Sequence, residues 1–177
     1  MARPFLLNVS GPYAVGKDTV LNAVIDRYPD RVHRVRTITT RPVKPGDDPS
    51  YTQLSPEEFD ERVATGRWLV NRQLGGQTAY GTSVDEIHDA AAQGLISVHS
   101  VFPGPAGAGR LREVFGRGLL SLGLLASHGS VDEQREVLRA RLVGRGRDAP
   151  DAIEARLRHQ DEPLAYVSAN PEVEAEE

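Results

Sequence analysis

The sequence predicts an α/β fold in three layers, with a parallel five-stranded sheet covered by helices on both faces. Short apolar runs alternate with helix-like runs along most of the 177 residues, and this alternation is typical of parallel sheets. A glycine-rich stretch, Gly11–Thr19, joins the first predicted strand to the first predicted helix, at the edge where such sheets bind ligands. Segment 37–83 breaks the alternation. We interpret it as a lobe inserted into one domain, residues 1–177, whose core comprises residues 1–36 and 84–177.

The elements of the core are predicted in the order strand, helix, strand. The candidate strands are short apolar runs at Phe5–Val9, Val32–Thr37, Leu95–Val101, Leu119–Leu125 and Leu164–Ser168. The candidate helices are the runs Asp18–Tyr28, Val84–Gln93, Leu111–Phe115, Val131–Val143 and Asp151–Gln160.

Three other stretches are predicted from their turn and cap residues. In the lobe, Ser55 can cap a helix and Glu58 can complete a capping box. Pro103–Gly109 is rich in proline and glycine, which predicts a connector. The acidic tail after Pro171 is predicted to be frayed and solvated.

The composition excludes several classes of protein. Without cysteine there is neither a disulfide framework nor a thiolate metal site. A formal net charge of −4 argues against a dedicated nucleic-acid binder. No apolar run approaches the roughly 20 residues that a membrane-spanning helix needs, and the apolar N-terminal run is too short for a signal peptide. We therefore expect a cytoplasmic protein with neither nucleic-acid nor membrane partners, as a monomer or a homodimer.

The glycine-rich stretch has the spacing of a phosphate-binding loop, a glycine followed by four residues and then Gly-Lys. Gly11 and Gly16 permit backbone angles that turn successive N–H groups toward an anion, and Lys17 can reach the outer phosphates. The residue after the lysine is Asp18, so Thr19 is the hydroxyl nearest a Mg²⁺ ion. An ordinary glycine-rich turn is the alternative. The candidate residues for ATP and Mg²⁺ here are Gly11, Ala14, Val15, Gly16, Lys17, Asp18 and Thr19.

Further motifs resemble the guanylate kinase family in order and spacing. They are Thr39-Thr40-Arg41 with Lys44, Tyr51, Ala79-Tyr80-Gly81-Thr82-Ser83, Arg141 to Arg147, and Arg156. The resemblance runs from about Phe5 to about Gln160. It implies a P-loop kinase fold in which the inserted lobe binds an acceptor and a helical lid, about residues 138–156, closes over ATP. The implied activity is transfer of the ATP γ-phosphate to the phosphate of a nucleoside monophosphate, most simply GMP.

The resemblance also implies a role for each matched residue. The acceptor's phosphate would contact Arg41, Lys44, Tyr51 and Tyr80, and its base would face Thr37 and Thr82. Arg141, Arg145 and Arg156 would be the lid and transfer arginines, with Arg141 and Arg145 also on ATP. The catalytic set is then Lys17, Arg41, Arg145 and Arg156. This chemistry needs such cations, because two anionic phosphates must approach each other.

Departures from the family concern the acceptor. The guanine-reading glutamate of the family falls on Asn71, and the strand Leu95–Val101 has His99 or Ser100 where the family has a carboxylate. We expect His99 to be a hydrogen-bonded, partly buried histidine. The chain also resembles ribose 1,5-bisphosphate phosphokinases at Lys17-Asp18 and at Arg145-Gly-Arg147. That activity, a kinase of a specialised nucleotide, and a non-catalytic guanylate kinase-like binding module are the alternatives.

Overall fold

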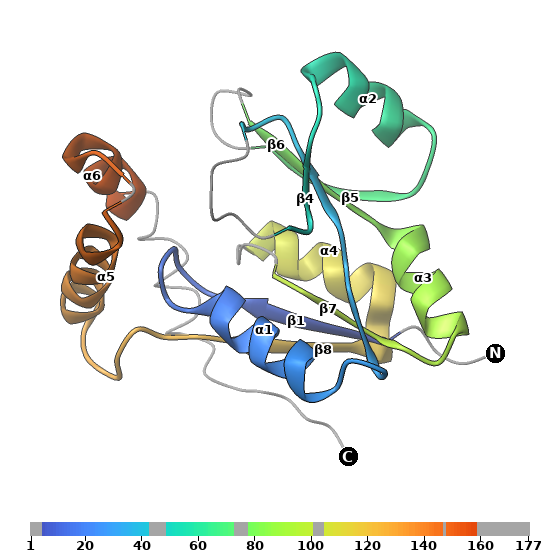
Figure 1. Ribbon diagram of the computed structural model, residues 1–177, viewed down its shortest axis with the longest axis horizontal. Helices are drawn as coiled ribbons and strands as arrows, with labels where there is room; N and C mark the ends of the chain where they lie inside the picture. The colour runs from blue at the N-terminus through green and yellow to red at the C-terminus, as the bar shows by residue number, and fades with distance from the viewer. Residues whose placement is uncertain (1–4, 43–48, 73–77, 101–104, 147, 159–177) are drawn as a thin grey trace. The chain divides into compact units, whose positions relative to one another are not determined.

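A computed structural model describes residues 5–42, 49–72, 78–100, 105–146 and 148–158 of the chain (Figure 1). Its elements, in order, are β1 (Leu6–Ser10), α1 (Lys17–Arg27), β2 (Val32–Arg34), β3 (Thr37–Thr39), β4 (Tyr51–Gln53), α2 (Pro56–Ala64), β5 (Trp68–Arg72), β6 (Ala79–Ser83), α3 (Val84–Ala92), β7 (Ile96–His99), α4 (Pro105–Phe115), the 3₁₀ turn η1 (Gly116–Gly118), β8 (Leu119–Gly123), α5 (Val131–Arg145) and α6 (Pro150–Arg158). The predicted α/β class is confirmed.

The first sheet has the strand order β2-β7-β1-β8. Strands β2 and β7 run parallel, with Val32 opposite Ile96 and Arg34 opposite Val98. The sheet has four strands within the described residues. The fifth predicted strand, Leu164–Ser168, lies outside them.

The prediction of one continuous strand over Val32–Thr37 is wrong. The chain forms β2, leaves the first sheet after Val35, and begins β3 of the second sheet at Thr37. Val35 still donates its N–H to the Val98 carbonyl at 3.1 Å. The next N–H, of Arg36, instead donates to the Glu86 carboxylate at 3.2 Å, and the Arg36 Nε does so at 3.3 Å. A side-chain acceptor on α3 thus ends the ladder.

The interpretation of Pro103–Gly109 as a connector is wrong from Pro105 onward. Helix α4 begins at Pro105, six residues before the predicted start at Leu111. Proline is favourable in the first turn of a helix because the missing N–H would have no partner there. The alanines that follow it are strong helix formers. Residues 103 and 104 lie outside the described residues.

The second sheet has the order β4-β3-β6-β5 and is drawn from Thr37–Ser83. Strand β3 runs parallel to β4 and antiparallel to β6, so the sheet is mixed. Helix α2 begins with the predicted capping box: the Ser55 hydroxyl accepts from the Glu58 N–H at 3.2 Å, and the Glu58 carboxylate accepts from the Ser55 N–H at 2.8 Å. Phe59 of α2 is fully buried in a cluster with Ile38 and Ala79.

By its contacts the chain divides into two compact units, one of residues 1–6 and 24–99 and one of residues 7–23 and 100–177. In the second unit, the loop after β1 shares a core with the two C-terminal helices. That core contains Ala14, Val15, Leu138, Leu142, Ile153 and Leu157. The predicted domain and lid boundaries remain predictions. Among the described helices, none combines the length and the apolar character that crossing a bilayer requires.

Candidate functional site

The backbone of the phosphate loop, Gly11–Thr19, takes up conformations that favour glycine. The φ angles of Gly11, Ala14 and Gly16 are 147°, 63° and 111°. A β-carbon on Gly11 would lie 2.7 Å from the Leu124 carbonyl oxygen, so this position admits only glycine. Ala14 adopts the left-handed region at a cost of roughly 1–2 kcal/mol. Its side chain is buried against α5 and α6, which hold that conformation.

Lys17 is the first residue of α1, and its ammonium group lies within the loop. It donates to the carbonyl oxygens of Gly11 at 2.9 Å and Pro12 at 2.8 Å. Burial lowers the pKa of Lys17 from 10.5 to about 8; the Asp18 carboxylate opposes this shift and the Arg145 charge adds to it. Burial favours the neutral form of Lys17, whereas a bound phosphate would stabilise its charged form. The position therefore suits an anion.

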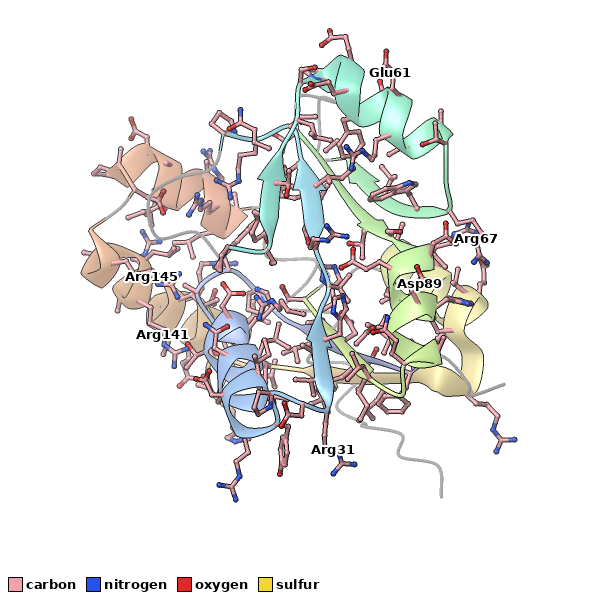
Figure 2. All side chains as sticks on the ribbon, turned by 45° about the vertical axis from the view of Figure 1, so that its right-hand side comes forward. Arg31, Glu61, Arg67, Asp89, Arg141 and Arg145 are labelled. Carbon is pink, nitrogen blue, oxygen red and sulfur yellow. The ribbon has the colours of Figure 1, made fainter. Side chains whose placement is uncertain are left out.

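Arg141 and Arg145 lie one turn apart on α5 (Figure 2). Arg141 Nη1 donates to the Val15 carbonyl at 3.0 Å and approaches the Ala14 carbonyl at 3.5 Å. Arg145 lies close enough to Lys17 for its charge to lower the pKa of the lysine. The structure therefore brings both predicted arginines to the phosphate loop. We call Gly11–Thr19 with Arg141, Arg145 and Arg156 the loop subsite.

Arg156 of α6 is positioned by a carboxylate that the sequence analysis missed. Its Nη1 donates to Asp148 at 2.5 Å, and the Asp148 side chain is only 8% exposed. The sequence feature that could have predicted this pair is an acidic residue just before the start of α6, eight residues ahead of the arginine. Because the Asp148 carboxylate is largely shielded from water, the pair fixes the direction of the guanidinium group.

The predicted magnesium ligand, Thr19, lies in the first turn of α1, where its side chain and that of Asp18 are exposed. In the part of the chain that the structure describes, no cluster of three or more His, Cys, Asp or Glu side chains could hold a metal ion. Mg²⁺ in kinases is commonly held by one or two protein oxygens and otherwise by substrate phosphates and water. The hydroxyl of Thr19 fits that kind of site.

In the other unit, three of the predicted acceptor residues lie together. The guanidinium carbon of Arg41 is 5.8 Å from the centre of the Tyr51 ring, within the range of a cation–π contact. The rings of Tyr51 and Tyr80 meet edge to face at 78°, with their centres 6.5 Å apart. The turn before Arg41 is held by Thr39, whose hydroxyl accepts from the Arg41 N–H at 3.1 Å. A cation and two phenols can bind a phosphate group.

The predicted base-facing residues form a buried polar cluster beside them. Thr37 and Thr82 are partners across β3 and β6. The Thr82 hydroxyl and His99 Nε2 are 2.8 Å apart, and both side chains are buried. His99 is thus a hydrogen-bonded histidine, as expected, and it is more deeply buried than predicted. We call Thr37, Arg41, Tyr51, Tyr80, Thr82 and His99 the lobe subsite.

The remaining acceptor candidates are less fully placed. Lys44 lies outside the described residues. Asn71 is the Cα partner of Tyr80 across β5 and β6, and only its backbone is described. Ser100 directly follows β7 and falls in the other compact unit.

Comparison with known proteins decides the family. The family model described as guanylate kinase matches residues 2–111. A guanylate kinase of Gloeobacter violaceus is 38% identical over 92% of this chain and 75% of its own length. The chain belongs to the guanylate kinase family. A guanylate kinase of Nostoc sp. is 31% identical over 90% of this chain and 75% of its own length. The crystal structure of the Anaplasma phagocytophilum guanylate kinase has a TM-score of 0.59 at 17% identity, covering 94% of this chain and 87% of that one, and so shares its fold.

Within the guanylate kinase family, this chain is predicted to lack a carboxylate at two acceptor-side positions. By the resemblance noted in the sequence, Asn71 falls where the family has its guanine-reading glutamate, and His99 or Ser100 falls where it has a carboxylate. Among the described residues of its unit, the buried polar side chains are Thr37, Thr39, Thr82, Ser97 and His99. This set contains hydroxyls and an imidazole but no carboxylate.

Proposed function

We propose that this guanylate kinase family member is an ATP- and Mg²⁺-dependent kinase that transfers the γ-phosphate of ATP to the phosphate of a nucleoside monophosphate, with a GMP-like acceptor. The observation that carries the proposal is the loop subsite. Lys17 lies inside a phosphate-binding loop that Arg141 contacts directly, with the Arg145 charge nearby. A concentration of cations at a glycine-rich loop suits a triphosphate.

The reaction requires charge neutralisation more than proton transfer. The phosphate of a nucleoside monophosphate is already ionised near neutral pH, so no general base has to deprotonate it. Lys17 would exchange the carbonyl oxygens of Gly11 and Pro12 for the outer phosphates of ATP. Arg145 and Arg156 would stabilise the charge that spreads over the transferred group. When bound, Mg²⁺ would neutralise further phosphate charge, with the Thr19 hydroxyl as its protein ligand.

The lobe subsite supplies the acceptor's contacts in this proposal. Arg41 would pair with the acceptor's phosphate, with Tyr51 and Tyr80 as hydroxyl partners. Lys44 would add a second cation, and Thr37, Thr82, Asn71 and Ser100 would surround the base. We propose that the protein works in the cytoplasm. Its partners would be small phosphorylated molecules rather than nucleic acids or membranes.

A second candidate is a kinase whose acceptor lacks guanine, such as ribose 1,5-bisphosphate or a specialised nucleotide. The specific observation in its favour is the absence of a carboxylate among the buried polar residues that the structure describes in the unit of the lobe subsite. A carboxylate pairs with the two N–H donors of guanine, and hydroxyl or imidazole groups replace that pairing only in part.

A panel of acceptors separates the two candidates. ADP release is measured with ATP, Mg²⁺ and, in turn, GMP, dGMP, IMP, AMP, CMP, UMP and ribose 1,5-bisphosphate. The proposal expects a kcat/KM at least about tenfold higher for GMP than for AMP. Equal kcat/KM values for GMP and AMP would contradict the assignment of a guanine base to the acceptor. Turnover of ribose 1,5-bisphosphate alone would establish the second candidate.

A non-catalytic binding module is the remaining alternative, and ATP binding itself tests it. A ligand at 100 times its dissociation constant stabilises the folded state by about 2.7 kcal/mol. We therefore expect ATP with Mg²⁺ to raise the melting temperature. An unchanged melting temperature together with no ADP release from any acceptor would favour the module.

A further inference from the structure

Tyr13 lies in the phosphate loop, where its aromatic ring is close to two cations. The ring centre is 6.0 Å from the Lys17 ammonium nitrogen and 5.7 Å from the guanidinium carbon of Arg156. Lys17 begins α1, whereas Arg156 lies on α6 near the other end of the described chain. Cations within about 6 Å of a ring centre are attracted by the negative face of the ring. One side chain therefore contacts two of the predicted catalytic cations.

Arg156 is held from a second direction as well. The largely buried Asp148 carboxylate accepts its Nη1 hydrogen at 2.5 Å. The neighbouring side chains Ile153 and Leu157 of α6 pack in the same core as Ala14 and Val15 of the loop. Helix α6 is thereby fixed against the loop, and Arg156 is directed by a carboxylate and an aromatic ring.

The ring also bears on the electrostatics of the loop. Lys17 is costly to keep charged, because burial and the Arg145 charge both favour its neutral form. Arg156 adds another positive charge beside the same ring. The face of an aromatic ring carries partial negative charge, so it stabilises nearby cations without a carboxylate. It can offset this repulsion and leave the cations available for phosphate.

We propose that Tyr13 is a positioning residue for phosphoryl transfer, whose ring holds the Lys17 ammonium and the Arg156 guanidinium at the phosphate loop. The inference rests on the proposed function, because the two cations are the groups that would act on the phosphates. It assigns the effect to the ring and not to the hydroxyl, since a phenyl ring carries the same negative face.

The test compares Tyr13→Leu, which removes the ring, with Tyr13→Phe, which removes only the hydroxyl. Loss of two cation–π contacts is expected to lower kcat about tenfold in Tyr13→Leu, and Tyr13→Phe should stay within about twofold of the unaltered protein. Tyr13→Met is a second ring-free variant in case the leucine does not fold. Melting temperatures identify variants that fold, and only those are compared.

Two readouts separate positioning from a general structural role. Without the ring, the two cations are held less firmly at the transferred phosphate, so kcat should fall in Tyr13→Leu while the KM for the acceptor, whose contacts lie in the lobe subsite, stays unchanged. In an Arg156→Ala background, Tyr13→Leu should lower kcat by less than in the unaltered protein, because coupled residues are not additive.

Equal kcat values and equal KM values in Tyr13→Leu, Tyr13→Met and Tyr13→Phe would overturn the inference. The proposed function would survive that result as long as the unaltered protein releases ADP with an acceptor. If the unaltered protein transferred no phosphate to any acceptor, both would be overturned.

Discussion

The loop subsite and the lobe subsite use different interactions, although both are assigned to phosphorylated ligands. In the loop subsite, Lys17 and Arg141 donate to backbone carbonyl oxygens, and the main-chain conformation of the loop determines where those oxygens lie. In the lobe subsite, Arg41 lies over a tyrosine ring and Thr82 pairs with a buried imidazole. The loop subsite therefore relies on charge, and the lobe subsite combines one guanidinium with phenol, hydroxyl and imidazole groups. Substitutions in the two should have different kinetic consequences.

The largest expected effect is at Lys17, the cation inside the loop. Lys17→Ala should lower kcat by about 10³-fold or more, judged from the effect of removing an arginine finger in related chemistry. The matched control is Arg110→Ala, which removes an exposed arginine whose partner is Glu113, one turn along α4. That control should leave ADP release unchanged. An unaltered rate in Lys17→Ala would contradict the role of the loop subsite.

Arg41 provides the equivalent test in the lobe subsite. Charge-assisted hydrogen bonds contribute about 1.5–3 kcal/mol each, so Arg41→Ala should lower kcat/KM for the acceptor by about 10²-fold. The KM for ATP should change little. Arg36→Ala is the control, since Arg36 is an exposed arginine that pairs with Glu86. If Arg41→Ala raised the KM for ATP as much as that for the acceptor, the separation of the two subsites would fail.

The pH dependence of Lys17 sharpens the comparison, because activity and stability should change in opposite directions. Burial lowers its pKa from 10.5 to about 8. The protonated fraction, and with it kcat/KM for ATP, should fall about tenfold between pH 7 and pH 9.

The stability of the fold should respond in the other direction. In the unfolded chain Lys17 keeps its proton up to its ordinary pKa, so between the folded and unfolded pKa values the unfolded state binds more protons. The contribution of Lys17 to the free energy of unfolding should therefore increase as the pH rises from about 8 to 10.5. Urea unfolding of the unaltered protein and of Lys17→Ala, without ATP, measures this contribution as the difference between the two pH profiles.

Much of the loop subsite could be predicted from sequence because its determinants are local. The spacing of Gly11, Gly16 and Lys17 requires a particular turn, and that turn follows a strand and begins a helix in the structure as predicted. The one-turn separation of Arg141 and Arg145 placed both on the same side of α5. Asp148 and Tyr13 were missed, since their importance depends on contacts with Arg156 that only the packing of α6 creates.

The lobe subsite was less predictable because its pairs are distant in sequence. The pairing of Thr82 with His99 joins β6 to β7, and the sequence indicates each residue separately without linking them. The end of β2 was missed for a similar reason, since Glu86 of α3 takes the N–H of Arg36. Strand propensity describes a residue's local preference, whereas a ladder ends where another acceptor is available.

The smallest expected effect tests whether the buried imidazole contributes to acceptor recognition. His99→Ala removes the partner of the Thr82 hydroxyl, which is then free to rotate. The loss of one hydrogen bond, about 1 kcal/mol, should raise the KM for the acceptor about fivefold and leave the KM for ATP unchanged. His99→Asn, whose amide can donate or accept, should restore part of that loss. His33→Ala is the control, because His33 is half-exposed and pairs with Glu86. An equal rise in both KM values would mean that His99 supports the fold as a whole, and the acceptor would then have to be selected by the charged contact at Arg41.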